Sequence, residues 1–175
     1  SKPMRKVVLR WRINSLQGAK ELGKILEICD KIEILAHLGF QDDGIIQLAE
    51  VKLKEGKDLN ELSDLPSFEV LEVHEENKEG ILLSLLCHHA LVKSAIEVSN
   101  LHLQCPYGID AERGMELRVT GLTAAMRRFL NLLRLVLPPD KVSVITDRKR
   151  QVNGWAEVLT ERQQEVIRHA VLRGY

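Results

Sequence analysis

Cysteine and histidine side chains gather in two short stretches of this chain, Cys87-His88-His89 and His102 with Cys105. Thiolate sulfur and imidazole nitrogen are the donors that zinc, copper and iron prefer, so these residues could form a metal or thiol site where neighbouring strands end. Their spacing matches no established zinc finger, because the chain contains neither C-x-x-C nor H-x-x-x-H. The favoured alternative is structural: the two cysteines are small buried hydrophobic residues, and the histidines lie on the surface at strand ends.

No motif of a known catalytic class accompanies these residues. The sequence has no phosphate-binding glycine loop, no dinucleotide fingerprint, no HExxH and no serine in a nucleophile elbow. The carboxylates of residues 50–79 include no isolated pair on an apolar face, which acid–base chemistry would need. We therefore expect a protein that is not an enzyme and that carries no cofactor.

The elements that must position the cysteines and histidines begin with residues 5–76. Residues 5–13 are rich in β-branched and aromatic side chains and predict a strand, and the spacing of apolar residues from Leu16 to Cys29 predicts a helix. Asp43-Gly44 between two apolar runs predicts a hairpin. Asp58 then caps a short helix, and the alternating residues 68–75 predict a further strand.

Residues 80–147 repeat that order of elements. A nearly continuous apolar run, residues 80–88, predicts a strand that is covered on both faces, and a short helix and two strands follow. The strongest predicted helix comes next and ends at Pro138-Pro139, before a last strand over residues 141–147. Its apolar face consists of Leu122, Met126, Phe129, Leu133 and Val136, and its polar face of Arg127, Arg128, Asn131 and Arg134.

The repeated order, strand–helix–strand–strand–helix–strand, is that of the ferredoxin-like unit. We therefore predict an α+β fold with two tandem ferredoxin-like (βαββαβ) units, over residues 1–76 and 80–149. Residues 150–175 would form a connector and a C-terminal helix. Each unit would leave one face of its sheet free for another sheet, a partner chain or a small ligand.

Charge is distributed unevenly along a chain whose 25 Lys and Arg balance 25 Asp and Glu. Residues 50–79 hold ten acidic and four basic side chains, whereas residues 141–175 hold seven basic and four acidic ones. The plain interpretation is two solvated surfaces. The alternative is that only the C-terminal end faces a polyanion, and that end includes the basic cluster Arg148-Lys149-Arg150.

The cellular compartment follows from what the sequence lacks. Its three cysteines are an odd number at wide spacing, so a disulfide framework is not expected. No apolar run reaches the roughly 18 residues of a spanning helix, and the first residues do not have the pattern of a signal peptide. We expect a cytoplasmic protein with no membrane partner.

The last residues, LTERQQEVIRHAVLRGY, predict one short amphipathic helix. Thr160 and Gln163 have the spacing of a capping box, and Arg173-Gly174 provides a basic last turn and a glycine stop. The phrase from Leu159 to Tyr175 resembles the start of the helix-turn-helix domain of archaeal regulators related to the bacterio-opsin activator. In those proteins such a phrase opens the first helix of the DNA-binding domain. The regulatory region before it also looks like successive strand–helix–strand–strand units.

The resemblance implies the regulatory region of a DNA-binding transcription regulator, which dimerises or senses a small-molecule effector. Thr160, Arg162, Gln163 and Arg168 match the opening helix, which supports the recognition helix and contacts phosphate in such domains. The helices that read bases would follow Tyr175, so no base-contacting residue can be named. A homodimer is expected because helix-turn-helix domains commonly bind two half-sites. The alternative is a ligand-binding module of ferredoxin-like type that acts through protein partners without DNA.

Overall fold

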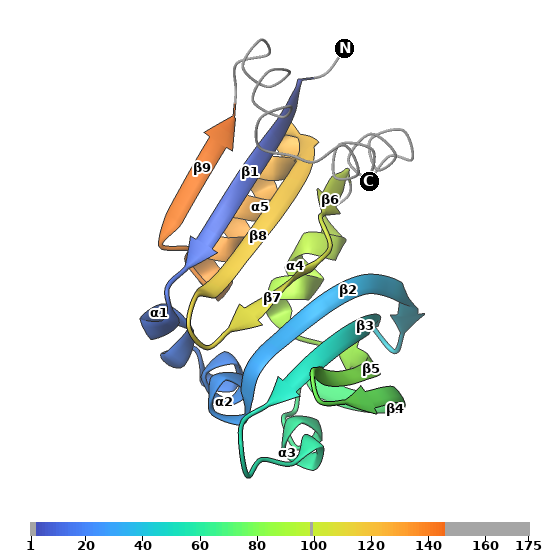
Figure 1. Ribbon diagram of the computed structural model, residues 1–175. Coiled ribbons are helices and arrows are strands. Elements are labelled where there is room, and N and C mark those ends of the chain that lie inside the picture. The colour runs from blue at the N-terminus through green and yellow to red at the C-terminus, as the bar shows by residue number, and fades with distance from the viewer. Residues whose placement is uncertain (1–2, 99, 146–175) are drawn as a thin grey trace. The chain divides into compact units, whose positions relative to one another are not determined.

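Figure 1 shows the fold of the protein in a computed structural model, which describes residues 3–98 and 100–145. The predicted basic cluster at residues 148–150 and the predicted helix at residues 159–175 lie outside the described residues. Within those ranges no helix is both long enough and apolar enough to cross a membrane.

The described chain contains nine strands and five helices, and its sheet pairing is mostly antiparallel, which confirms the predicted α+β class. The first elements are β1 (Met4–Trp11), α1 (Ile13–Gln17), α2 (Lys20–Ile28), β2 (Cys29–Gln41), β3 (Gly44–Leu53), α3 (Leu59–Ser63) and β4 (Phe68–Asn77). They are followed by β5 (Gly80–Cys87), α4 (Ala90–Glu97), β6 (Leu101–Leu103), β7 (Tyr107–Asp110), β8 (Gly114–Leu122), α5 (Thr123–Val136) and β9 (Lys141–Ile145).

Two compact units make up the chain, and they are interleaved along the sequence. Unit 2 comprises Arg10–Lys93 and Cys105–Glu116, and the described part of unit 1 comprises residues 3–9, 94–98, 100–104 and 117–145. Most of β1 therefore belongs to unit 1, whereas β5 belongs to unit 2. For this reason the strand order does not clearly match two ferredoxin-like units built from successive halves of the chain.

Unit 2 contains an antiparallel sheet in which the strands follow the order β4-β5-β3-β2-β7. The predicted hairpin at Asp43-Gly44 is confirmed, since β2 and β3 pair around a turn at Asp42 and Asp43. Both turn residues have positive φ, 48° and 61°, which is the conformation that a tight hairpin turn requires.

One face of this sheet forms the core of unit 2. Ala49 and Val51 of β3 and Leu83 and Leu85 of β5 have no exposed surface. The apolar sides of α2 and α3 are buried as well, at Leu22, Ile25, Leu26 and Leu62. The predicted cap of the short helix is confirmed: Asp58 accepts a hydrogen bond from the Asn60 backbone N–H (2.7 Å), and its own N–H donates to the Glu61 carboxylate (2.8 Å).

Unit 1 contains β9, β1 and β8 side by side, with β6 also paired to β8. Helix α5 runs behind β1 and β8 and covers one face of this sheet (Figure 1). Met126, Phe129 and Leu133 of the predicted apolar face are buried, together with Ala125, whereas Leu122 and Val136 are half-buried. The arginines of the opposite face are exposed, as the periodicity predicted.

A candidate binding site around Tyr107

The structure distributes the predicted cysteine and histidine residues over both units. Cys87 ends β5, His88 and His89 lie between β5 and α4, and Cys105 precedes β7, all in unit 2. His102 lies in β6 of unit 1, where it pairs with Thr120 of β8. Over residues 3–98 and 100–145, no group of three or more His, Cys, Asp or Glu side chains is placed to hold a metal ion.

His89 is fixed by an aromatic neighbour and a backbone donor. Its ring stacks on Phe68, with 6.1 Å between ring centroids and an interplanar angle of 21°. The Leu91 N–H donates to His89 Nδ1 (3.1 Å), so this nitrogen is unprotonated and a neutral ring carries its hydrogen on Nε2. Burial lowers the pKa of His89, and the carboxylate of Glu21 partly opposes that shift.

Tyr107 is the centre of a hydrogen-bond network in unit 2 that runs from the buried Gln47 to the exposed His37. Gln47 Nε2 donates to the Tyr107 hydroxyl oxygen (2.8 Å), and that hydroxyl lies 2.7 Å from His37 Nε2. With His37 as a neutral imidazole, its Nε2 accepts from the hydroxyl in one tautomer and donates to the second lone pair of the hydroxyl oxygen in the other. Burial lowers the pKa of His37, which favours the same neutral form.

Both predicted cysteines of unit 2 lie close enough to influence this tyrosine. Burial raises the pKa of Tyr107 well above its usual 10, and negative charge on Cys105 or Cys87 would raise it further, while the hydrogen bond from Gln47 opposes the shift. Burial also raises the pKa of Cys87 and of Cys105 to about 11 each. At neutral pH the phenol and both thiols are therefore protonated and uncharged.

The pairing of the strands explains why these side chains share one face of the sheet. His37 of β2 and Gln47 of β3 are direct neighbours, and Tyr107 of β7 pairs with Ile34 of β2. Ile45 is next to both Cys87 and Phe40, whose side chain is 74% exposed. The face thus passes from buried polar groups to an exposed aromatic residue at the end of the sheet.

His37, Gln47 and Tyr107 are absent from the residues that the sequence singled out. The sequence did contain a signal for Gln47. It is the one polar residue on a face of β3 whose other residues, Ile45, Ala49 and Val51, are apolar. The position of His37 could not be predicted because β2 contains a β-bulge. Strict alternation of side chains would place His37 on the opposite face of the strand from Ile34. The register shifts between Ile34 and Ala36, however, and this shift turns His37 to the face of Gln47.

A second group of buried polar residues lies in unit 1. Lys6 of β1 and Thr120 of β8 are nearly fully buried, as is Gln104, which follows β6. The Gln104 N–H donates to the Arg118 carbonyl (2.9 Å), whereas its side-chain Oε1 is buried with no hydrogen-bond partner among the described residues.

The network around Tyr107 combines a phenol and two thiols whose pKa values are raised by burial with an imidazole whose pKa is lowered by burial. What the site offers is neutral hydrogen-bonding groups, two thiols and an exposed aromatic ring. No family model, no curated protein and no solved structure matches this chain, so this geometry and the sequence together carry the functional argument.

Proposed function

We propose that this chain is the regulatory region of a DNA-binding transcription regulator, with unit 2 as the sensing part and unit 1 on the side of the DNA. The observation that carries this proposal is the separation of charge between the units. Unit 2 has 11 Lys and Arg against 19 Asp and Glu, a formal charge of −8, and the described part of unit 1 has seven against two, a formal charge of +5. A polyanion attracts the basic unit 1 and repels the acidic unit 2.

The C-terminal sequence supports the same orientation. Arg148-Lys149-Arg150 follow the last strand of the basic unit, and Thr160, Arg162, Gln163 and Arg168 match the opening helix of the domain that the sequence resembles. These seven residues are proposed as the connector and supporting helix of the DNA-binding domain, where they contact phosphate rather than bases.

We further infer that each unit is ferredoxin-like, with the first strand exchanged between them. A ferredoxin-like unit of four strands arranges them in the order fourth, first, third, second. Unit 2 follows that order as β4-β5-β3-β2, with β5 in the place of β1. In unit 1 the order is β9-β1-β8-β6, with β1 in the place of β5. The exchange accounts for two units that are interleaved in sequence.

We assign effector sensing to the network around Tyr107. In this proposal the protein acts as a homodimer, and its function needs neither a catalytic step nor a bound cofactor. The buried groups there are neutral at physiological pH, so an uncharged small molecule suits the site better than a phosphate or a carboxylate. Such an effector regulates by binding one arrangement of the dimer more tightly than another, which shifts the population of that arrangement.

The test is a fluorescence-anisotropy titration of DNA with the complete gene product at several salt concentrations. Binding should weaken linearly on a logarithmic scale as salt rises, with a slope of about −0.9 per phosphate contact. The triple variant Arg148→Ala, Lys149→Ala, Arg150→Ala should bind more weakly and with a shallower slope. A gene product that shows no salt-dependent binding to any DNA would contradict the proposal.

A second candidate function is a ligand-binding module that acts through protein partners without DNA. It is favoured by the site itself, because all the residues of the Tyr107 network lie in unit 2. This function predicts effector binding that Tyr107→Phe weakens, together with no DNA binding by the complete gene product.

A further inference from the structure

Helix α5 carries a basic face that points away from its core side. At 100° per residue, Arg134, Arg127 and Arg128 lie within a sector of about 120°, with Asn131 and Leu135 between them. The three arginines are exposed and Leu135 is 85% exposed, the largest exposed fraction among the exposed large hydrophobic residues. No Asp or Glu occurs in α5, and these arginines form no ion pair with any described residue.

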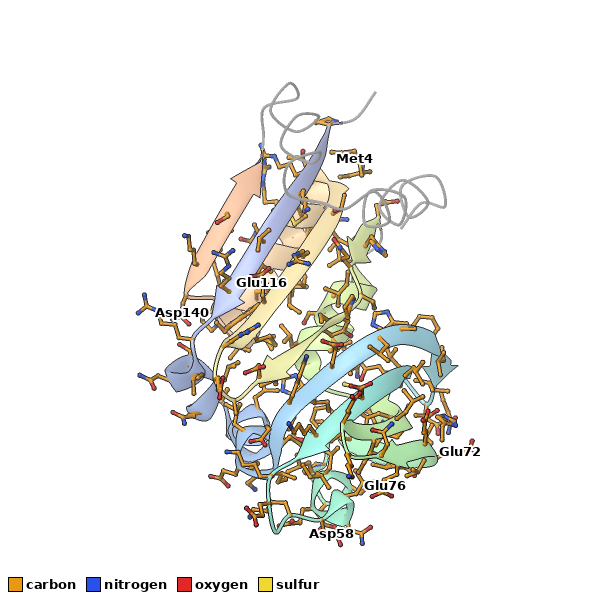
Figure 2. All side chains as sticks on the ribbon, in the orientation of Figure 1. Met4, Asp58, Glu72, Glu76, Glu116 and Asp140 are labelled. Atoms are coloured by element: carbon orange, nitrogen blue, oxygen red, sulfur yellow. The ribbon has the colours of Figure 1, made fainter. Side chains whose placement is uncertain are left out.

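The free edge of the sheet in unit 2 has the complementary composition. Strand β4 ends the strand order, and every residue from Leu71 to Asn77 is exposed (Figure 2, where Glu72 and Glu76 are labelled). Glu69, Glu72 and Glu75 pair with Leu86, Ser84 and Leu82 of β5, so the three carboxylates lie along one face of the edge strand. Leu71 and Val73 on the same strand are 38% and 45% exposed.

We propose that two copies of this chain associate by docking α5 of one copy on the β4 edge of the other. The inference rests on the dimerisation part of the proposed function and names the two surfaces that make the dimer. Each copy carries both surfaces, so the acidic edge of one copy can meet the basic helix of another. Two equal β4 edges could not pair with each other in this way, since their carboxylates would repel.

The spacing of the charges fits this contact. Arg127 and Arg134 are seven residues apart on a helix, which separates them by about 10 Å along its axis. The β5 partners of Glu69 and Glu75 are four residues apart on a strand, which separates the two carboxylates by about 13 Å. Long arginine side chains cover the difference, and a guanidinium binds a carboxylate through two parallel hydrogen bonds.

The apolar residues favour a protein partner over DNA. Leu135 lies beside Arg128 on the basic face, where a phosphate backbone would leave it without an apolar neighbour. Leu71 of β4 is 38% exposed and supplies an apolar neighbour on the acidic edge, whereas Val73 pairs with Leu83 and lies on the opposite face of the strand from the three carboxylates. A contact that combines arginines with apolar side chains is typical of the interfaces between proteins.

Charge reversal tests the contact, because reversing the charges on both surfaces together should restore the dimer that reversal on either surface alone weakens. The basic-face variant is Arg127→Glu, Arg128→Glu, Arg134→Glu, and the edge variant is Glu69→Arg, Glu72→Arg, Glu75→Arg, each made in the complete gene product. Sedimentation equilibrium at low salt should show that either triple variant weakens dimerisation by about tenfold or more. The chain with all six changes should recover most of that loss, because opposite charges meet again. A control with Lys24→Glu, Lys52→Glu, Arg113→Glu, three exposed cations outside both surfaces, should dimerise as the wild type does.

The outcomes separate this inference from the proposed function. A wild type that stays monomeric overturns both the contact and the dimerisation part of the proposed function. A dimer that neither triple variant weakens, or that the six changes do not restore, overturns the contact alone. If the basic-face variant loses DNA binding but keeps its dimer, α5 faces DNA and the contact is also overturned.

Discussion

The Tyr107 hydroxyl is the shared partner of two side chains. Gln47 donates to it and His37 Nε2 lies 2.7 Å from it, so both contacts are lost if the hydroxyl is removed. The side chain of Gln47 is 1% exposed, and water cannot replace the lost acceptor without entering the core.

We expect Tyr107→Phe to lower the free energy of unfolding by about 1–3 kcal/mol, because the Gln47 amide is left buried without its acceptor. Urea denaturation followed by circular dichroism measures the change. The double variant Tyr107→Phe, Gln47→Leu removes both partners and should cost less than Tyr107→Phe alone. A double variant that is less stable than the single one would contradict the assigned hydrogen bond.

His37 and His89 of unit 2 make the stability of the protein depend on pH, although His37 keeps part of its surface exposed and His89 is half-buried. Burial lowers the pKa of His37 and of His89 in the folded state, so below about pH 6.5 the unfolded chain takes up protons that the folded chain does not. Their contribution to stability is therefore complete above that pH and is lost as the pH falls through the window below it.

The matching measurement is urea denaturation at pH 8 and at pH 5.5. The loss of unfolding free energy between the two values should be smaller in His37→Gln and in His89→Gln than in the wild type. Equal losses in the wild type and both variants would show that neither ring is held neutral by burial.

At the scale of single elements, local pattern was sufficient where the partner is near in sequence. The hairpin of β2 and β3, the capped helix α3 and the amphipathic helix α5 could all be predicted, because turn residues, caps and periodicity act over a few residues. The β-bulge that turns His37 to the face of Gln47 could not be predicted, since a bulge depends on the partner strand. The strands that pair with β1 and those that pair with β5 could not be predicted either, because alternation indicates which residues are buried and does not identify the neighbouring strand.

Gly108 of β7 shows how close two strands can come. A Cβ at this position would lie against the backbone carbonyl oxygen of Ile32 on β2, an atom that cannot move aside without breaking the pairing. Gly108→Ala should therefore destabilise the protein by about 1–3 kcal/mol.

Gly18 is the matched control, because a Cβ there meets only ordinary contacts of 3.7 Å and its φ is −77°. Gly18→Ala should leave stability unchanged or raise it by up to about 1 kcal/mol. Thermal unfolding of the two variants decides, and a Gly108→Ala protein as stable as Gly18→Ala would refute the close approach.

The net charge of the whole chain is zero, yet unit 2 is acidic and unit 1 is basic. The sequence predicted this asymmetry only in part, because the described basic residues of unit 1 come from two segments that are far apart in the chain, residues 3–9 and 117–145. The proposed exchange of first strands has the same origin: each half of the chain contains the elements of a unit, but the first strand of each half completes the other unit. Neither half would then be a domain by itself.

Expression of the two halves as separate polypeptides, divided at the exposed turn between Lys78 and Glu79, tests this exchange most directly. Each half alone should be unfolded by circular dichroism and by the dispersion of its amide resonances, because its sheet lacks the first strand. An equimolar mixture should regain the spectrum of the intact chain. Two halves that each fold cooperatively alone, and whose spectra do not change on mixing, would contradict the exchange of strands.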